Sequence, residues 1–191
     1  MVRTYDMTNR AQQAAQTTQR IAEATEALLT ERPIVDVTLQ SIAEESGVTV
    51  QTVLRHMGSR EGCFGVVRQQ LGTRVQEQRE GSAPGDVEGA IAGLLAHYEA
   101  EGRLVLNLLT QEHGGDPLVV EAAQTGRAYH RAWVQRCFGP RLREPSETTV
   151  DALVAATDLY IWKLLRLDLG RSPDATRTVI SALINAVLED S

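Results

Sequence analysis

Apolar residues recur every three or four positions along almost the whole chain, and this spacing predicts α-helices. In the segment from residue 8 to 30, for example, Ala14, Ile21, Ala24 and Leu28 share one face. Capping residues and helix breakers divide the pattern into nine predicted helices, at about residues 8–30, 38–47, 49–57, 59–80, 86–100, 104–111, 117–138, 146–169 and 172–188. No segment shows convincing two-residue alternation of a half-buried strand. The sequence therefore predicts an all-α fold.

The segment with the most specific pattern is residues 42–57, IAEESGVTVQTVLRHM. A helix-turn-helix needs a small residue where its two helices cross and a glycine in the tight turn four residues later, and Ala43 and Gly47 have this spacing. Thr49 can cap the second helix, whose polar side chains can then enter a major groove of DNA. From the pattern alone, a plain helical hairpin within an all-α domain stays open as an alternative.

The wider stretch from residue 20 to 67 resembles the N-terminal domain of the TetR family of repressors. The matching pieces are Thr38, Ile42-Ala43, Ser46-Gly47-Val48-Thr49, Thr52 and Met57-Gly58-Ser59-Arg60-Glu61. The resemblance implies a three-helix helix-turn-helix DNA-binding domain over residues 1–58. It also implies a helical ligand-binding and dimerisation domain over residues 59–191.

The predicted DNA-facing residues surround the start and the outer face of the second helix of the motif. They are Thr38, Thr49, Val50, Gln51, Thr52, Leu54, Arg55, His56 and Arg60. We expect Thr38 and Thr49 to stand at helix N-termini, where free amides favour a phosphate. Arg60 is the third predicted phosphate contact, and a purely capping role for the two threonines is compatible with phosphate binding.

Base recognition is predicted for Gln51, Thr52 and Arg55. Glutamine can pair with adenine and arginine with guanine through two hydrogen bonds. At Val50 the family often has lysine, and at Leu54 it often has tyrosine, so these two positions depart from the family's pattern. Both apolar side chains can instead contact a thymine methyl group. The same departures leave open an alternative function, a dimeric helical ligand-binding module with a degenerate helix-turn-helix and no operator.

The last two predicted helices, at residues 146–169 and 172–188, carry more apolar residues than one core-facing stripe needs. Two such helices from each of two subunits can form a four-helix bundle, and the TetR resemblance implies the same homodimer interface. The alternative is that both helices are buried within one subunit. A dimer also suits a near-palindromic operator in double-stranded DNA, because two recognition helices double the contacts.

A small-molecule effector pocket among the middle helices is implied by the same resemblance. Tyr98, Trp133 and Tyr160 are the candidate lining residues, with core packing as the alternative role for each of them. His97, His113 and His130 have acidic neighbours, but their spacing gives no metal motif, so we expect no metal and no cofactor.

Composition adds constraints on the class of protein. The net charge is −6, and the first 80 residues hold nine arginines and ten acidic residues, so DNA binding depends on the motif and not on bulk charge. The two cysteines form no disulfide framework, and no apolar run is long enough for a membrane span or a secretion signal, so we expect a cytoplasmic protein. No phosphate loop or nucleophile motif of an enzyme is present. The sequence therefore predicts a DNA-binding transcriptional regulator, a repressor released from its operator by a small apolar ligand, and not an enzyme.

Overall fold

The computed structural model describes residues 2–190, and all regular structure within them is helical. The α-helices are α1 (Val2–Glu31), α2 (Leu39–Ser46), α3 (Val50–Met57), α4 (Arg60–Arg79), α5 (Val87–Thr110), α6 (Pro117–Phe138), α7 (Glu147–Ala156), α8 (Leu159–Lys163) and α9 (Pro173–Glu189). Short 3-10 turns are η1 (Ile34–Asp36), η2 (Glu112–Gly114) and η3 (Gly139–Arg141), and a π-helical turn, η4 (Leu164–Asp168), follows α8. The predicted all-α fold is confirmed.

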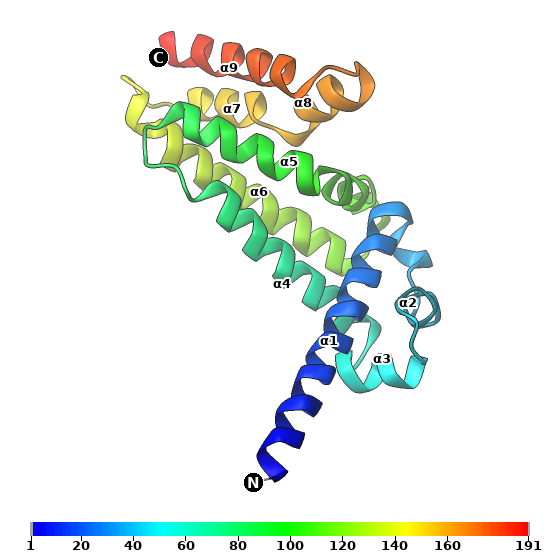
Figure 1. Cartoon of the computed structure of the whole chain (residues 1–191). Coiled ribbons are helices and arrows are strands. Elements are labelled where there is room, and N and C mark those ends of the chain that lie inside the picture. Colours follow the sequence, from blue (N-terminus) through cyan, green and yellow to red (C-terminus); the bar gives the residue numbers. More distant parts are fainter. Residues whose placement is uncertain (1, 191) are drawn as a thin grey trace.

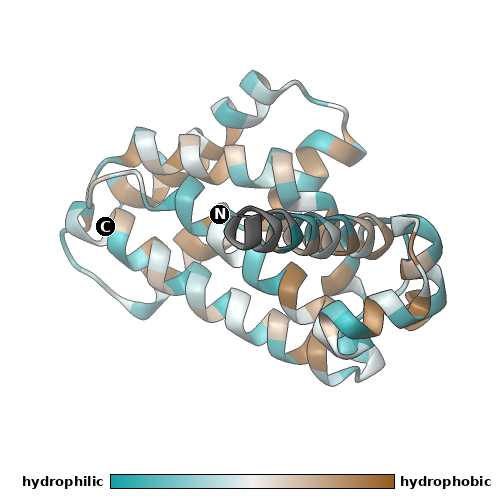
Figure 2. Cartoon of the chain, turned by 60° about the horizontal axis from the view of Figure 1, so that its bottom comes forward, coloured by the Kyte–Doolittle hydropathy of each residue, from teal (hydrophilic) through white to brown (hydrophobic). Residues whose placement is uncertain are grey.

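The helices form two groups that are joined by α4, α5 and α6 (Figure 1). Helices α1, α2 and α3 lie at one end of the molecule, and α7, α8 and α9 lie at the other. Along each helix, hydrophilic and hydrophobic residues alternate in short patches, as amphipathic packing requires (Figure 2). The recognition motif and the C-terminal helices are therefore well separated within one chain.

Two hydrophobic cores correspond to these groups. The N-terminal core contains Ile21, Val37, Ile42 and Val53, and it also contains Cys63 and other residues from the first half of α4. The C-terminal core is built from buried residues of α5, α6, α7, α8 and α9. Helix α4 thus contributes to the N-terminal core although it continues into the C-terminal domain. The expected division at residues 58 and 59 stays a prediction.

Side chains at the C-terminal end of α5 and directly after it hold the end of α1 and join the two cores. The amide of Asn107 donates to the carbonyl oxygens of Leu29 at 2.7 Å and of Arg32 at 2.8 Å. The side-chain oxygen of Gln111 accepts from the backbone N–H of Ile34 at 2.6 Å. These bonds satisfy backbone groups that the end of α1 leaves without helical partners.

The predicted break between residues 100 and 104 is wrong, because α5 is one continuous helix. Gly102, which lies within the predicted break, is buried inside α5 against Trp162. A Cβ atom at this position would lie 2.7 Å from a carbon of that indole ring. The glycine therefore serves close packing, and the tertiary contact outweighs its weak helix propensity.

The predicted continuous helix at residues 146–169 is also wrong, because the chain bends between α7 and α8. The Thr157 hydroxyl donates to the carbonyl of Leu153, and the Asp158 carboxylate accepts from the N–H of Tyr160 and caps α8. The helix then loosens into a π-helical turn, in which the N–H of Leu169 donates to the carbonyl of Leu164 at 2.9 Å. Local side-chain bonds of threonine and aspartate compete here with the regular helix.

Candidate DNA-binding surface and ligand site

Helix α2 begins with a complete capping box. The Thr38 hydroxyl accepts from the N–H of Ser41 at 3.1 Å, and the Ser41 hydroxyl accepts from the N–H of Thr38 at 2.9 Å. Thr38 is exposed, and it lies at the helix N-terminus, where the first-turn amides have no partners within the helix. This position suits the predicted phosphate contact, which stays a prediction.

The turn between α2 and α3 has the geometry that the sequence predicts. Ala43 is 3% exposed, and Gly47 has a φ of 66°, in the left-handed region that favours glycine. The N–H of Val48 donates back to the carbonyl of Ala43 at 3.0 Å. The small alanine and the left-handed glycine together let α2 and α3 pack closely around a tight turn.

Helix α3 buries one face and exposes the opposite one. Val53 is fully buried in the N-terminal core, whereas Gln51 and Arg55 are exposed. Gln51 and Arg55 are four residues apart, so they lie on one face, one turn from each other. No side-chain hydrogen bond or ion pair engages either of them within residues 2–190. This face is therefore available to a partner.

The other side chains of α3 are partly engaged within the protein. Thr49 caps the helix by accepting from the N–H of Thr52 at 3.2 Å, and the two hydroxyls lie 3.0 Å apart. Thr49 is exposed, whereas Thr52, Val50 and Leu54 are half-buried. Val50 packs against the N-terminal core. A smaller fraction of Val50, Thr52 and Leu54 is accessible than of Gln51 and Arg55.

His56 and Arg60 are held by other elements of the domain. The Nδ1 atom of His56 lies 3.0 Å from the hydroxyl of Thr18 on α1. The guanidinium of Arg60 donates to the carbonyl oxygens of Val37, at 2.6 Å, and Ile34, and it lies over a phenyl ring of the N-terminal core. His56 lies in the last turn of α3 and Arg60 begins α4, and the structure gives Arg60 an internal bonding role that the sequence did not predict.

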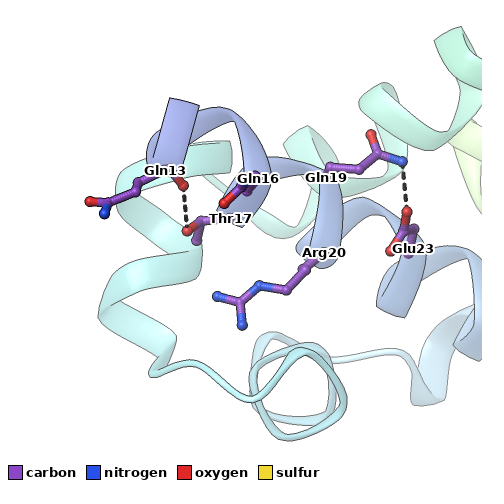
Figure 3. Close-up of a pocket in the computed structure, with 6 residues that line it drawn as sticks. All are labelled: Gln13, Gln16, Thr17, Gln19, Arg20 and Glu23. Carbon is purple, nitrogen blue, oxygen red and sulfur yellow. Dashed lines mark hydrogen bonds between the residues drawn. The ribbon is translucent and has the colours of Figure 1, made fainter. Parts of the chain in front are cut away.

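Sequence reasoning missed the polar side of α1, which borders the helix-turn-helix. An open, polar depression on this side is lined by Gln13, Gln16, Thr17, Gln19, Arg20 and Glu23. Figure 3 shows Arg20 extending away from α1 toward the neighbouring helices of the domain. Arg20 is exposed and makes no ion pair within the described residues, so it is a further cation near the recognition helix. The signal that could have found it is an arginine at the first position of the stretch, residues 20–67, that resembles the TetR family.

Two of the three predicted pocket residues are buried together in the C-terminal domain. Tyr98 is 4% exposed and donates its hydroxyl hydrogen to the carbonyl of Thr157 at 2.8 Å. Trp133 is 2% exposed, and its indole N–H donates to the carbonyl of Arg79 at 3.2 Å. Burial raises the pKa of Tyr98 to about 12, so its hydroxyl stays protonated. Tyr160 is 50% exposed on α8, apart from this buried group.

A small cavity of about 140 Å³ lies elsewhere, beside the N-terminal core. Its lining is mainly apolar and comes from α1, η1, α4, α5 and α6, including Phe64, Leu71, Leu104 and Leu118. None of the predicted pocket residues lines it. Within the described residues, no group of three histidine, cysteine or acidic side chains is arranged to hold a metal ion. Over residues 2–190, no helix has both the length and the hydropathy of a membrane span.

Comparison with known proteins agrees with this geometry. Residues 21–67 match the family model of bacterial regulatory proteins, tetR family. No curated protein matches the chain significantly.

Solved structures with the same fold cover nearly the whole chain. A transcriptional regulator from Rhodococcus sp. Rha1 is 18% identical, with a TM-score of 0.68 over 91% of this chain and 96% of that one. A regulator from Pseudomonas aeruginosa PAO1 is 15% identical, with a TM-score of 0.66 over 92% of this chain and 91% of that one. The ketosteroid transcriptional regulator KstR2 of Mycobacterium tuberculosis is 16% identical, with a TM-score of 0.57 over 91% of this chain and 93% of that one.

The helix-turn-helix with its open α3 face, followed by a helical C-terminal domain, defines a DNA-binding transcriptional regulator. Residues 21–67 carry the match to the tetR family model, and the chain as a whole shares the fold of solved transcriptional regulators.

Proposed function

We propose that this protein is a dimeric repressor that binds a near-palindromic operator in double-stranded DNA and is released by a small ligand with an apolar body. The observation that carries the proposal is the α3 face, on which Gln51 and Arg55 are exposed and unengaged while Val53 is buried. Such a face can enter a major groove and read base edges. A protein that acts on chromosomal DNA works in the cytoplasm of a bacterium, which is where we place it.

The phosphate contacts that we propose come from Thr38 and Thr49 at the starts of α2 and α3. Both are exposed caps of helix N-termini, where backbone amides and the helix dipole favour an anion. We add Arg20 of α1 to this group. Val50 and Leu54, which are half-buried, keep enough accessible surface for a thymine methyl contact.

Dimerisation is supported by the exposed apolar surface of the last two helices. Seven large hydrophobic residues are exposed among those described, and six of them lie on or beside α8 and α9: Tyr160, Leu164, Leu167, Leu169, Val179 and Leu183. Ile180 and Ile184 are fully buried in the same subunit, so α9 is apolar on two sides. A second copy would cover the outer side. We therefore assign Tyr160 to the dimer face and not to the pocket.

DNA binding is tested by selecting sequences from random double-stranded DNA and measuring affinity by mobility shift at several salt concentrations. We expect specific binding that weakens steeply with salt. Replacing Gln51 or Arg55 by alanine should weaken specific binding by roughly 5- to 150-fold, which corresponds to about 1–3 kcal/mol per lost base contact.

The control variants are Q124A and R143A, because Gln124 and Arg143 are exposed on other parts of the protein. They should bind as the unchanged protein does. If no sequence is selected, or if Q51A and R55A bind as the controls do, the repressor proposal fails. A dimeric ligand-binding module without an operator then takes its place.

A further inference from the structure

A cation is buried without a counter-ion in the C-terminal domain. Arg79, the last residue of α4, is 3% exposed. Within the described residues, no carboxylate oxygen lies within 4.0 Å of its guanidinium. Aromatic rings surround it instead, with centroids at 4.9 Å for Trp133, 5.2 Å for Tyr98 and 6.0 Å for Tyr129. Rings attract a cation, but they replace neither the water nor the counter-ion that it lost.

The chain pairs its other inward-facing cation on α4 fully. Arg74 donates to Glu101 of α5 at 2.6 Å and to Glu26 of α1 at 2.9 Å. Glu101 is 7% exposed, so this pairing satisfies a buried charge only about one turn before Arg79 on the same helix. The missing partner of Arg79 is therefore not a general feature of this domain.

Further polar groups around Arg79 also have unused hydrogen-bonding capacity. The Nε of Arg79, both ring nitrogens of His97 on α5, and the hydroxyl of Tyr129 on α6 are buried without partners in the described residues. His97 is 6% exposed, and burial together with the charge of Arg79 lowers its pKa to about 3. Buried polar groups are nearly always bonded, so three unbonded ones that face one region from three helices need an explanation.

A chain of hydrogen bonds fixes the neutral form of His130 next to this group. Arg79 can only donate, so the Nδ1 of His130, at 3.0 Å, accepts from it. The Nε2 of His130 then carries the hydrogen and donates to the hydroxyl of Thr157 at 3.1 Å, and that hydroxyl donates to the carbonyl of Leu153. His130 is thus occupied at both nitrogens and neutralises no charge.

We propose that Arg79, His97 and Tyr129 bind the carboxylate of a small organic monoacid whose body is aromatic or aliphatic. One unpaired cation with neutral histidines beside it balances one negative charge, which favours a monocarboxylate over a phosphate or a dianion. The aromatic walls suit an apolar body. This inference rests on the proposed function, for which it names the chemical class of the effector.

The position of Arg79 connects the acid site to the DNA-binding domain. Arg79 ends α4, and Arg60, which begins α4, is bonded to the carbonyls of Val37 and Ile34. A ligand that draws the guanidinium toward its carboxylate acts on the helix that carries the recognition motif at its other end. Through His130 it also acts on Thr157, where α7 ends.

The test measures binding of phenylacetate, benzoate and octanoate to the full-length protein, each compared with its neutral amide. Tryptophan fluorescence reports on binding, because Trp133 lies against Arg79, and the thermal melting temperature is the second measurement. At least one acid should bind ten or more times more tightly than its amide and raise the melting temperature. If no acid is distinguished from its amide, the proposal is overturned.

The variant R79M should lose the preference for the acid at least tenfold, whereas R143M, at an exposed position, should keep it. R79M should also melt no lower than the unchanged protein, because methionine fills an apolar site without burying a charge. A clearly lower melting temperature with acid binding retained would show that Arg79 is structural and would overturn the proposal.

Operator binding of the unchanged protein is measured separately by mobility shift. Acid binding without any operator binding would sink the proposed function and leave the acid site intact. Operator binding without a preference for the acid over its amide would overturn the acid site and leave the proposed function intact.

Discussion

Arg60 illustrates how far a single side chain can be predicted. The family resemblance implies a phosphate contact for it, and its charge and its place after the Gly58-Ser59 junction are visible in the sequence. Its bonds to the carbonyls of Val37 and Ile34 are not visible, because those groups lie more than 20 residues earlier and come close only on folding. A local pattern gives residue type and face, but not long-range partners.

The variant R60M should lower the free energy of unfolding by about 2 kcal/mol, since it removes hydrogen bonds of a charged donor from partly buried carbonyls. Urea denaturation followed by circular dichroism measures this. R60K should restore part of the loss. Unchanged stability together with weakened DNA binding would contradict the structural role and support the phosphate contact alone.

Two histidines of the C-terminal domain, His97 (buried) and His130 (half-buried), predict a dependence of stability on pH. Desolvation and the charge of Arg79 lower the pKa of His97 to about 3 and that of His130 to about 4. In the unfolded chain both histidines take up a proton near pH 6.5, so the unfolded state binds more protons below that pH. The free energy of unfolding is therefore not reduced by these histidines above pH 6.5, and it decreases as the pH falls toward 4.

Each histidine should contribute a slope of up to about 1.4 kcal/mol per pH unit in that window. Replacing His97 by leucine should remove one of the two contributions, so the difference in unfolding free energy between variant and unchanged protein should grow between pH 6.5 and pH 4. Denaturation curves at several pH values provide the measurement. Parallel pH profiles of the two proteins would show that His97 is protonated in the folded state.

At the scale of the elements, the sequence predicts most helices but not where they stay continuous. The caps at Thr38, Thr49 and Ser59 and the turn at Gly47 are local, and the structure has all of them. The continuity of α5 through Gly102 depends on packing against Trp162 of α8, and the bend after α7 depends on side-chain bonds of Thr157 and Asp158 that compete with the helix. These are the two places where the predicted helix boundaries fail.

The variant G102A should destabilise the protein by about 1–3 kcal/mol, because its methyl group would overlap the ring of Trp162. G126A is the matched control, since Gly126 is exposed within α6 and a Cβ there meets nothing within 4 Å. That control should instead gain up to about 1 kcal/mol from reduced chain entropy. The melting temperatures of both variants are the measurement. Equal changes in the two melting temperatures would refute the packing role of Gly102.

At the scale of the whole molecule, the sequence predicts the architecture better than the sites. The helix-turn-helix, the helical C-terminal domain and the apolar last helices follow from periodicity and resemblance. The buried cluster around Arg79 does not, because its members come from α4, α5 and α6 and show no common spacing. A buried unpaired arginine can be recognised only when burial and partners are both known.

The apolar face of α8 and α9 predicts a dimer that charge should disrupt. The variant L183R places a cation in the centre of the exposed side of α9, and we expect it to be monomeric at micromolar concentrations and to bind the operator more weakly. Sedimentation velocity measures the oligomeric state. V35R is the control, because Val35 is 70% exposed in the N-terminal domain. Both variants remaining dimeric would place the interface elsewhere.

The contribution of α4, α5 and α6 to the N-terminal core limits how this regulator can be recombined. A chimera cut at residue 58 would separate Cys63 and Phe64 from the core that they fill, and it would remove Asn107 and Gln111 from the end of α1. A chimera that joins this DNA-binding domain to another ligand-binding domain therefore has to include the first half of α4. It also has to provide a surface that packs against the end of α1. Engineered biosensors and natural domain exchange face the same constraint.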